Sequence, residues 1–228
     1  MGEFCTAILV AAGDSSRMQG IDKVMEPVGG VPMLLRTAQA VAASVCIDAL
    51  VIVTREDLLP RTEAMCSALA KPVTVVSGGM SRAESVLCGL RAVPQETRLV
   101  AIHDGARPLV SVSVIDAAIR MAAATGAAAP AVALHDTVKV AHDGIVSYTP
   151  DRATLFAVQT PQVFDKGKIL AALLDAMAQG LPLTDDCSAV EAAGMQVTLT
   201  DGSEENLKIT TPTDLILAEA ILKRRETQ

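Results

Sequence analysis

A loop of small residues that carries two cations follows the first apolar run of the chain. The run ends in Ala11, Ala12 and Gly13, and Arg17 and Lys23 stand shortly after them. Backbone N–H groups of such a loop can approach phosphate oxygens, because no large side chain stands in the way. An arginine can fork onto a phosphate, and a lysine adds a mobile positive charge. The stretch matches neither the P-loop nor the G-x-G-x-x-G pattern, so an ordinary strand-to-helix turn with solvated cations stays open beside the phosphate site.

A second loop, "SGGMSRAESV", places two glycines before a predicted helix. Ser81 and Glu84 have the spacing of a capping box. The N-terminus of a helix suits an anion or the polar edge of a base. An ordinary loop is the alternative.

A carboxylate follows the fourth buried run, in "IHDGARPLV". Asp104 is expected at the carboxyl end of that strand, where it could hold Mg²⁺ or a substrate hydroxyl. Alternatively, it pairs structurally with Arg107 or caps a turn. His103 is expected to pack inside rather than to act in catalysis.

Weaker candidates are scattered through the second half of the chain. They are Thr137, Arg152, Thr160, the pair Asp185-Asp186 and Lys208. The acidic pair falls in a predicted first helical turn, where acidic residues are favoured in any case.

The elements that must position these residues alternate between strand and helix. Strands are expected over 4–10, 49–54, 73–76 and 99–103, and helices over 33–45, 57–69, 81–92 and 111–124. Four β-α units in a row predict an α/β fold, with a mostly parallel sheet and helices on both faces. Ligands of such sheets bind at the carboxyl ends of the strands.

The segment 135–160 interrupts this alternation after an extended run over 128–134. Two alternating stretches flank Asp143-Gly144, which is a strong hairpin signal. Because an isolated hairpin is marginal in water, we expect this β-arm to pack on something, such as a second subunit. The simplest organisation is one domain over 1–228 with this arm.

The last third of the chain continues with further helices and strands. Helices are expected over 165–178 and 184–194, with Asp165 and Thr184 as caps, and strands over 195–200 and 206–209. Thr211 caps a closing helix that has Pro212 at its first position.

Composition excludes several classes of protein. The formal net charge is −7 and the chain holds Trp 0, Tyr 1 and Phe 3, so neither the basic face nor the stacking aromatics of a nucleic-acid binder are expected. The first apolar run is too short for a signal core or a membrane span. The five cysteines show no CxxC or zinc-ligand spacing. These features predict a cytoplasmic protein with reduced thiols and without nucleic-acid or membrane partners.

Taken together, these segments resemble the 2-C-methyl-D-erythritol 4-phosphate cytidylyltransferases. The resemblance rests on "AAGDSSRM…DK", "SGGMSRAESVLCGL", "IHDGARP", "HDTVK", "DRATLFAVQTPQVF", "TDDCSAVEAAG" and "NLKITTPTDLILAE", in order over nearly the whole chain. It implies a Rossmann-like fold of the nucleotide-diphosphosugar transferase type and a homodimer joined through the arm. It also implies transfer of CMP from CTP to 2-C-methyl-D-erythritol 4-phosphate, with Mg²⁺, in non-mevalonate isoprenoid biosynthesis.

The resemblance assigns roles residue by residue. Arg17 and Lys23 match the residues that stabilise charge on the α-phosphate, and Arg152 and Lys208 those that position the sugar phosphate. Thr137 joins the latter pair, and it and Arg152 would reach across the dimer. The remaining matches are nucleotide contacts at Ala11, Ala12, Gly13, Gly79 and Ser85, and substrate contacts at Asp104 and Thr160, with Asp104 also on the metal side.

Three positions depart from the family pattern. Ser15 replaces a usual glycine, Asp22 stands where proline precedes the lysine, and Met80 replaces a common acidic residue. These departures bear on the geometry of the phosphate loop and on the base contacts. They keep a non-catalytic nucleotide-binding protein open as an alternative. A cytidylyltransferase that uses ribitol 5-phosphate is a second alternative, because it would share the loops and differ only in the pocket for the polyol.

Overall fold

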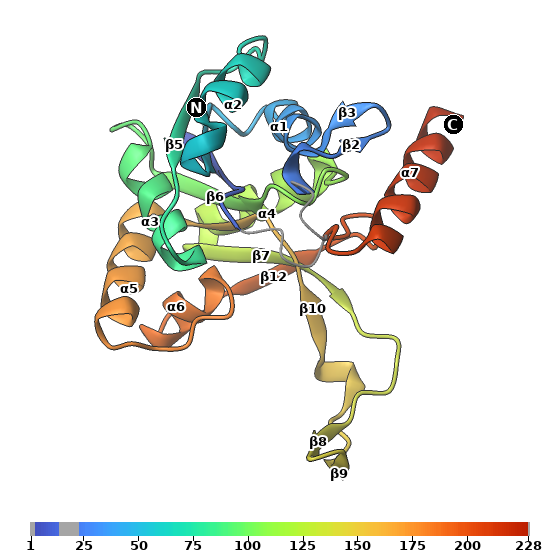
Figure 1. Cartoon of the computed structure of the whole chain (residues 1–228). Coiled ribbons are helices and arrows are strands. Elements are labelled where there is room, and N and C mark those ends of the chain that lie inside the picture. Colours follow the sequence, from blue (N-terminus) through green and yellow to red (C-terminus); the bar gives the residue numbers. More distant parts are fainter. Residues whose placement is uncertain (1–2, 14–22, 228) are drawn as a thin grey trace.

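The protein is built around one central β-sheet. The computed structural model describes residues 3–13 and 23–227. The strands of the sheet lie in the order β10-β7-β11-β6-β1-β4-β5, and β12 pairs with β7 (Figure 1). The strands β1 (Cys5–Val10), β4 (Ala49–Thr54), β5 (Val73–Ser77) and β6 (Leu99–Asp104) are mutually parallel. They are nearly continuous apolar runs, as strands covered on both faces require. The predicted parallel core is therefore confirmed.

The other half of the sheet mixes directions. β11 (Gln162–Asp165) runs antiparallel to both β6 and β7 (Ala127–Ala133). β10 (Phe156–Val158) is also antiparallel to β7, whereas β12 (Thr198–Asp201) is parallel to it. The sequence did not predict β10 or β11. As a result, the chain between β10 and β11 lies beside the carboxyl end of β6.

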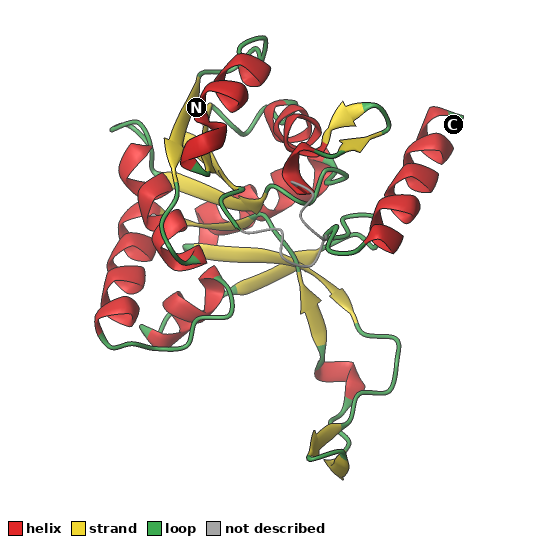
Figure 2. Ribbon diagram, viewed as in Figure 1, coloured by secondary structure: helices red, strands yellow, loops and turns green. Residues whose placement is uncertain are grey.

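Helices cover both faces of the sheet, as predicted (Figure 2). One buried cluster joins the sheet to α1 (Met33–Ala42), α2 (Leu59–Cys66) and α4 (Val112–Thr125). The other joins it to α3 (Arg82–Ala92), α5 (Lys166–Ala178) and α6 (Asp186–Ala192). Along β1, Ala7 and Leu9 belong to the first cluster and Ile8 to the second, because successive side chains of a strand point to opposite faces.

The closing helix α7 (Pro212–Glu226) packs differently. It contributes to a third, smaller cluster with Val28, Met33 and Leu109. Thr211 caps its start with Pro212 in the first turn, as the sequence predicts, and the structure adds a capping box between Thr211 and Asp214. Short elements complete the chain: β2 (Pro27–Val28), β3 (Val31–Pro32), η2 (Lys23–Met25), η3 (Glu56–Leu58) and η4 (Arg152–Thr154).

Several predicted boundaries are wrong. Asp185, not Thr184, caps α6, because the carboxylate of Asp185 accepts the N–H of Ser188 while Ser188 bonds back. The predicted strand over 206–209 is irregular, since this segment is held by the bonds described below rather than by a sheet partner. The expected helix over 57–69 is a short 3₁₀ turn followed by α2, which contains Pro60 near its start.

The β-arm leaves the sheet after β7 and returns as β10. Between them, β8 (Val140–His142) and β9 (Ile145–Tyr148) form the predicted hairpin. Asp143 and Gly144 have φ of 51° and 79°, the left-handed conformation that a tight hairpin turn needs. Figure 1 shows this hairpin projecting well away from the body of the protein. Within the described ranges, no helix is both long and apolar enough to cross a membrane.

Candidate active site

A cavity of about 430 Å³ opens at the carboxyl ends of β1, β4, β5 and β6, where open α/β sheets bind ligands. Eight of the predicted site residues line it: Ala11, Ala12, Gly13, Lys23, Gly79, Ser85, Asp104 and Lys208. Residues that were far apart in the sequence therefore meet in one place. Met80 also lines the cavity and is fully exposed at its edge.

The loop after β1 and the loop after β5 contact each other because both have small residues at the contact. A Cβ built on Gly78 would lie 2.3 Å from the Cβ of Ala12, so the loop after β5 can approach the loop after β1 this closely only with glycine there. The hydroxyl of Ser85 accepts the N–H of Gly79 at 3.2 Å and donates to the carbonyl of Ser81 at 2.9 Å. This glycine loop is therefore held in shape before any ligand arrives.

The predicted capping box at the start of α3 is present. The Ser81 hydroxyl accepts the N–H of Glu84, and the Glu84 carboxylate accepts the N–H of Ser81. The start of α3 thus faces the cavity with its end fixed, and its backbone dipole favours a negative or polar ligand group.

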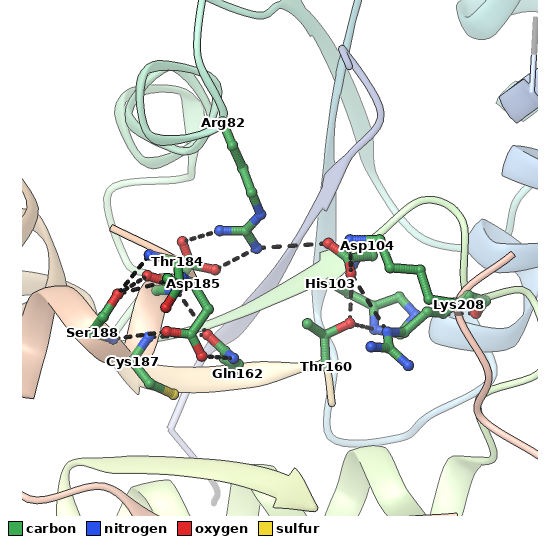
Figure 3. Close-up of polar contacts among 12 residues, drawn as sticks. Arg82, His103, Asp104, Thr160, Gln162, Thr184, Asp185, Cys187, Ser188 and Lys208 are labelled. Atoms are coloured by element: carbon green, nitrogen blue, oxygen red, sulfur yellow. Dashed lines mark hydrogen bonds and ion pairs between the residues drawn. The ribbon is translucent and has the colours of Figure 1, made fainter. Parts of the chain in front are cut away.

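Three cations surround the carboxylate of Asp104, which is buried at the cavity wall. Its Oδ2 lies 2.9 Å from Nζ of Lys208 and 3.5 Å from Nε of Arg107. Its Oδ1 lies 3.6 Å from Nη2 of Arg82. Burial alone would raise the pKa of Asp104, but Lys208 and the two arginines outweigh it and lower that pKa to about 2. Asp104 is therefore ionised at every physiological pH. Figure 3 shows its side chain with those of Arg82 and Lys208.

The sequence did not single out Arg82, which lines the same cavity. Its Nη1 and Nη2 each donate to one carboxylate oxygen of Asp186 at 2.8 Å. Asp186 is almost fully buried. Asp186 lies in the first turn of α6, as the sequence predicts, and Asp185 is the N-cap of that helix. Asp186 is more than an ordinary first-turn residue, however, because it also forms this long-range ion pair.

A hydrogen-bonded chain fixes the end of β6 from behind. The Asp104 N–H donates to Oγ1 of Thr160 at 3.1 Å, and the Thr160 hydroxyl pairs with Nδ1 of His103 at 2.9 Å. Nε2 of His103 lies 3.2 Å from the carbonyl of Arg107, which makes it the donor nitrogen and Nδ1 the acceptor. Burial lowers the pKa of His103 to about 4. His103 is thus a neutral, packed residue, as predicted.

Thr160 is buried behind Asp104 rather than exposed on the cavity wall. It belongs to the sequence "QTPQ", whose two glutamines the sequence analysis did not assign. Gln162 accepts the N–H groups of Asp186 and Cys187 and donates to Asp185 at 2.7 Å. It therefore anchors the first turn of α6 to the central sheet.

Gln159 anchors the segment that contains Lys208 to the sheet in a similar way. It donates to the carbonyl of Ser203 at 2.8 Å and accepts from the N–H of Ser203 and from Nδ2 of Asn206. Arg107 donates to the carbonyl of Asn206, and Ile209 to that of Ala106. These bonds, rather than strand pairing, hold Lys208 at the cavity. No pattern in the sequence marks these two glutamines beyond their place in the quoted motif.

Two predicted residues lie elsewhere. Thr137 and Arg152 are exposed on the β-arm and do not line the cavity of their own chain. Nη1 of Arg152 donates to the carbonyl of His135 at 2.5 Å. Arg17, together with Ser15 and Asp22, lies outside the described residues.

The donor set for a metal is small. Across 3–13 and 23–227, no three Asp, Glu, His or Cys side chains form a group that could hold a metal ion by themselves. Asp104 offers one ionised carboxylate at the cavity wall. Mg²⁺ commonly takes one or two carboxylates and completes its shell with phosphates and water. The single carboxylate of Asp104 therefore fits a Mg²⁺ ion that is bound mainly by the phosphates of a ligand and enters the cavity with them.

Comparison with known proteins agrees with this geometry. A family model described as IspD, 2-C-methyl-D-erythritol 4-phosphate cytidylyltransferase, matches residues 5–224. A relative of that name from Desulforamulus reducens is 45% identical over 228 residues, covering 96% of each chain. Another from Symbiobacterium thermophilum is 40% identical over 225 residues, covering 98% of this chain and 94% of its own.

A solved structure is similar over the same length. The 4-diphosphocytidyl-2C-methyl-D-erythritol synthase of Anaerococcus prevotii superposes with a TM-score of 0.88 at 32% identity, covering 97% of this chain and 96% of its own. That likeness confirms the predicted α/β nucleotidyltransferase fold, and the family match confirms the resemblance seen in the sequence. The chain belongs to the 2-C-methyl-D-erythritol 4-phosphate cytidylyltransferase family.

Proposed function

We propose that this chain transfers CMP from CTP to 2-C-methyl-D-erythritol 4-phosphate and releases pyrophosphate, as a step of non-mevalonate isoprenoid biosynthesis. The observation that carries the proposal is the meeting of the Ala-Ala-Gly loop with Lys23, Asp104 and Lys208 around one cavity, in a chain of this family. The relatives described above bear the methylerythritol phosphate name, which favours this acceptor over ribitol 5-phosphate.

The reaction needs no protein base, because the nucleophile is already an anion. An oxygen of the acceptor phosphate attacks the α-phosphorus of CTP and forms a new P–O bond. The bond from that phosphorus to the oxygen leading to the β-phosphate breaks, and pyrophosphate leaves with the electron pair. The protein has to supply position and positive charge. A neutral, buried His103 is consistent with a mechanism of this kind.

The roles follow from where the residues lie and from the family. We assign the loop residues Ala11 to Gly13, with Gly79 and Ser85, to the nucleotide. Lys23 would draw charge from the α-phosphate together with Arg17. Lys208 would hold the acceptor phosphate. Preorganised donors of this kind act strongly where water is excluded.

A bound Mg²⁺ would add positive charge at the phosphate oxygens. Asp104 is the residue we assign to hold it, together with the phosphates of CTP. Asp104 would also contact the substrate, and Thr160 would act with it from behind the cavity wall.

We further propose a homodimer joined through the β-arm. Ile145, Val146 and Tyr148 of the arm are 76%, 54% and 59% exposed, and a hairpin that presents apolar side chains to water marks an interface. Thr137 and Arg152 would then enter the cavity of the second copy. For the compartment, the cytoplasm stays our prediction, which cell fractionation would test.

The first experiment measures pyrophosphate release from CTP and Mg²⁺ with each acceptor separately. Release with methylerythritol phosphate alone supports the proposal, and release with ribitol 5-phosphate alone replaces the acceptor. Calorimetry that finds CTP binding in a protein without release would indicate a non-catalytic nucleotide-binding protein.

A mixing experiment tests the shared site. Arg152→Ala and Lys208→Ala are each expected to be inactive, but a mixed dimer would hold one site with both residues intact. Random reassortment of two such inactive variants should restore about one quarter of wild-type activity if the dimer is symmetric. No recovery, with dimers shown by light scattering, would place Arg152 in the site of its own chain or outside the mechanism.

A further inference from the structure

A cation outside the predicted site residues stands at the cavity wall. Arg82 is the first residue of α3, directly after its Ser81 cap. Its side chain is 33% exposed and lines the cavity. Both terminal nitrogens donate to the carboxylate of Asp186. Bidentate pairing of this kind fixes the plane of a guanidinium as well as its distance.

The anchor of this arginine is itself immobile. The Asp186 side chain is 2% exposed, and its N–H donates to Oε1 of Gln162 at 2.9 Å. Gln162 belongs to β11, in the central sheet. A buried ion pair is a poor source of net stability, because the desolvation of two charges offsets their attraction. Its place beside the cavity calls for another explanation.

The explanation lies in the second carboxylate that Arg82 faces. Nη2 lies 2.8 Å from Oδ2 of Asp186 and 3.6 Å from Oδ1 of Asp104. Lys208 approaches the other oxygen of Asp104, Oδ2, at 2.9 Å. Figure 3 shows Arg82 and Lys208 converging on Asp104 from different elements. Oδ2 of Asp104 thus faces Lys208 and Arg107, whereas Arg82 is the cation that faces Oδ1.

The two cations differ in how firmly they are held. Lys208 is 41% exposed, and under the proposed function its ammonium turns to the acceptor phosphate. Arg82 stays in place, because Asp186 holds both of its terminal nitrogens. We infer that Arg82, locked by Asp186, is a positioning residue that keeps the Asp104 carboxylate in its reactive orientation while Lys208 engages substrate. This inference rests on the proposed function and adds a residue pair to it.

The variants must separate positioning from folding. Arg82→Gln alone leaves Asp186 as an uncompensated buried charge and is expected to destabilise the fold. The double variant Arg82→Gln/Asp186→Asn replaces the ion pair with two neutral amides of similar size. Arg82→Lys keeps the charge but cannot serve two carboxylates with a planar fork. Arg91→Gln, on the exposed last turn of the same helix, removes one positive charge elsewhere and is the matched control.

Steady-state pyrophosphate release is measured for each variant with CTP and acceptor varied in turn, alongside its melting temperature. For the double variant we expect a kcat about 10- to 100-fold below wild type, the range that a small misplacement of a reacting group costs. Its KM for CTP and its melting temperature should stay close to wild type. Arg82→Lys should recover only part of kcat, and Arg91→Gln should behave as wild type.

Other outcomes overturn the inference. A double variant with wild-type kcat shows that the pair is only structural. An intact kcat with a raised KM for CTP makes Arg82 a nucleotide contact instead. If the wild type releases no pyrophosphate with either acceptor, the proposed function fails by itself, and a crystal structure of the double variant still tests the pair. We expect the Asp104 side chain to leave its wild-type orientation there while α3 and α6 keep their places. An unmoved Asp104 would refute the positioning role.

Discussion

Nζ of Lys208 lies 2.9 Å from Oδ2 of Asp104, although neither residue belongs to an element next to the other in the chain. Asp104 ends β6, in the parallel core, and Lys208 lies in an irregular segment before α7. The contact exists because the N–H of Ile209 donates to the carbonyl of Ala106. This bond places the segment that contains Lys208 beside the loop after β6. A substrate phosphate that binds here has to compete with Asp104 for the lysine.

Removing that lysine should sharply lower catalytic efficiency with little effect on the fold. Lys208→Ala is expected to lower kcat/KM for the acceptor by about 100-fold or more, the usual effect of losing one preorganised charge donor. Its melting temperature should stay close to wild type, because the side chain is partly exposed. Initial rates and thermal unfolding measure the two effects, with Lys223→Ala on the exposed end of α7 as control. A Lys208→Ala enzyme with near-normal turnover would remove the residue from the mechanism.

The parallel core was predictable because its signals are local. β-branched and aliphatic runs, one capping box at Ser81 and Glu84, and the Asp143-Gly144 turn each specify their element from a few neighbouring residues. The motif residues at strand ends then had to meet at one edge of the sheet. That geometric rule explains why Ala11, Ala12, Gly13, Gly79 and Asp104 line one cavity.

What sequence reasoning missed depends on long-range polar contacts. Gln159, Gln162 and Arg82 are polar residues whose partners lie far along the chain, and periodicity carries no information about such pairing. The segment 206–209 has the alternation of a strand, but its backbone is held by buried side chains. Predicting a strand from alternation alone fails in such a segment, because its backbone hydrogen-bonds to buried side chains and not to a neighbouring strand.

Gln159 offers a test of that scaffold. It is buried, and its amide makes three hydrogen bonds to Ser203 and Asn206. Gln159→Ala should loosen the segment that carries Lys208, and it should lower the free energy of unfolding by about 1–3 kcal/mol, as expected for leaving buried polar groups unpaired. kcat/KM for the acceptor should fall by about tenfold or more if Lys208 shifts by as little as 1 Å. Urea unfolding and initial rates check both effects.

The Gln159→Glu variant sharpens this test. It keeps the acceptor oxygen but buries a carboxylate against the Ser203 carbonyl, so the expected loss of stability is at least as large as for Gln159→Ala. A loss of stability without any change in kcat/KM would contradict the link between Gln159 and Lys208.

The five cysteines should divide into two groups that react with a thiol reagent at different rates. Burial raises the pKa of the Cys66 thiol to about 11, and it raises the pKa values of Cys5 and Cys187 further. Because only a thiolate reacts readily, these three should resist a thiol reagent in the native protein. Cys46 and Cys88, which are partly exposed, should react first. Timed labelling with peptide mapping tests the order, and denatured protein should label at all five. Rapid native labelling of Cys187 would contradict its packed position.

The buried His103 makes stability depend on pH. Its folded pKa of about 4 lies below the ordinary histidine pKa of about 6.5, so the unfolded chain binds the proton more tightly. The stabilisation is therefore present above pH 6.5 and is lost as the pH falls toward 4, by about 2 kcal/mol between pH 7 and pH 5. Urea unfolding at these two pH values should show that loss.

Two histidine variants serve as controls. His103→Gln should have a lower free energy of unfolding than wild type at pH 7, but that free energy should fall less on acidification. His135→Gln, at an exposed position on the arm, should follow the wild type. Equal slopes for His103→Gln and wild type would mean that His103 takes up its proton as readily in the folded protein as in the unfolded chain, which would contradict the neutral, buried state that accepts the Thr160 hydroxyl behind Asp104.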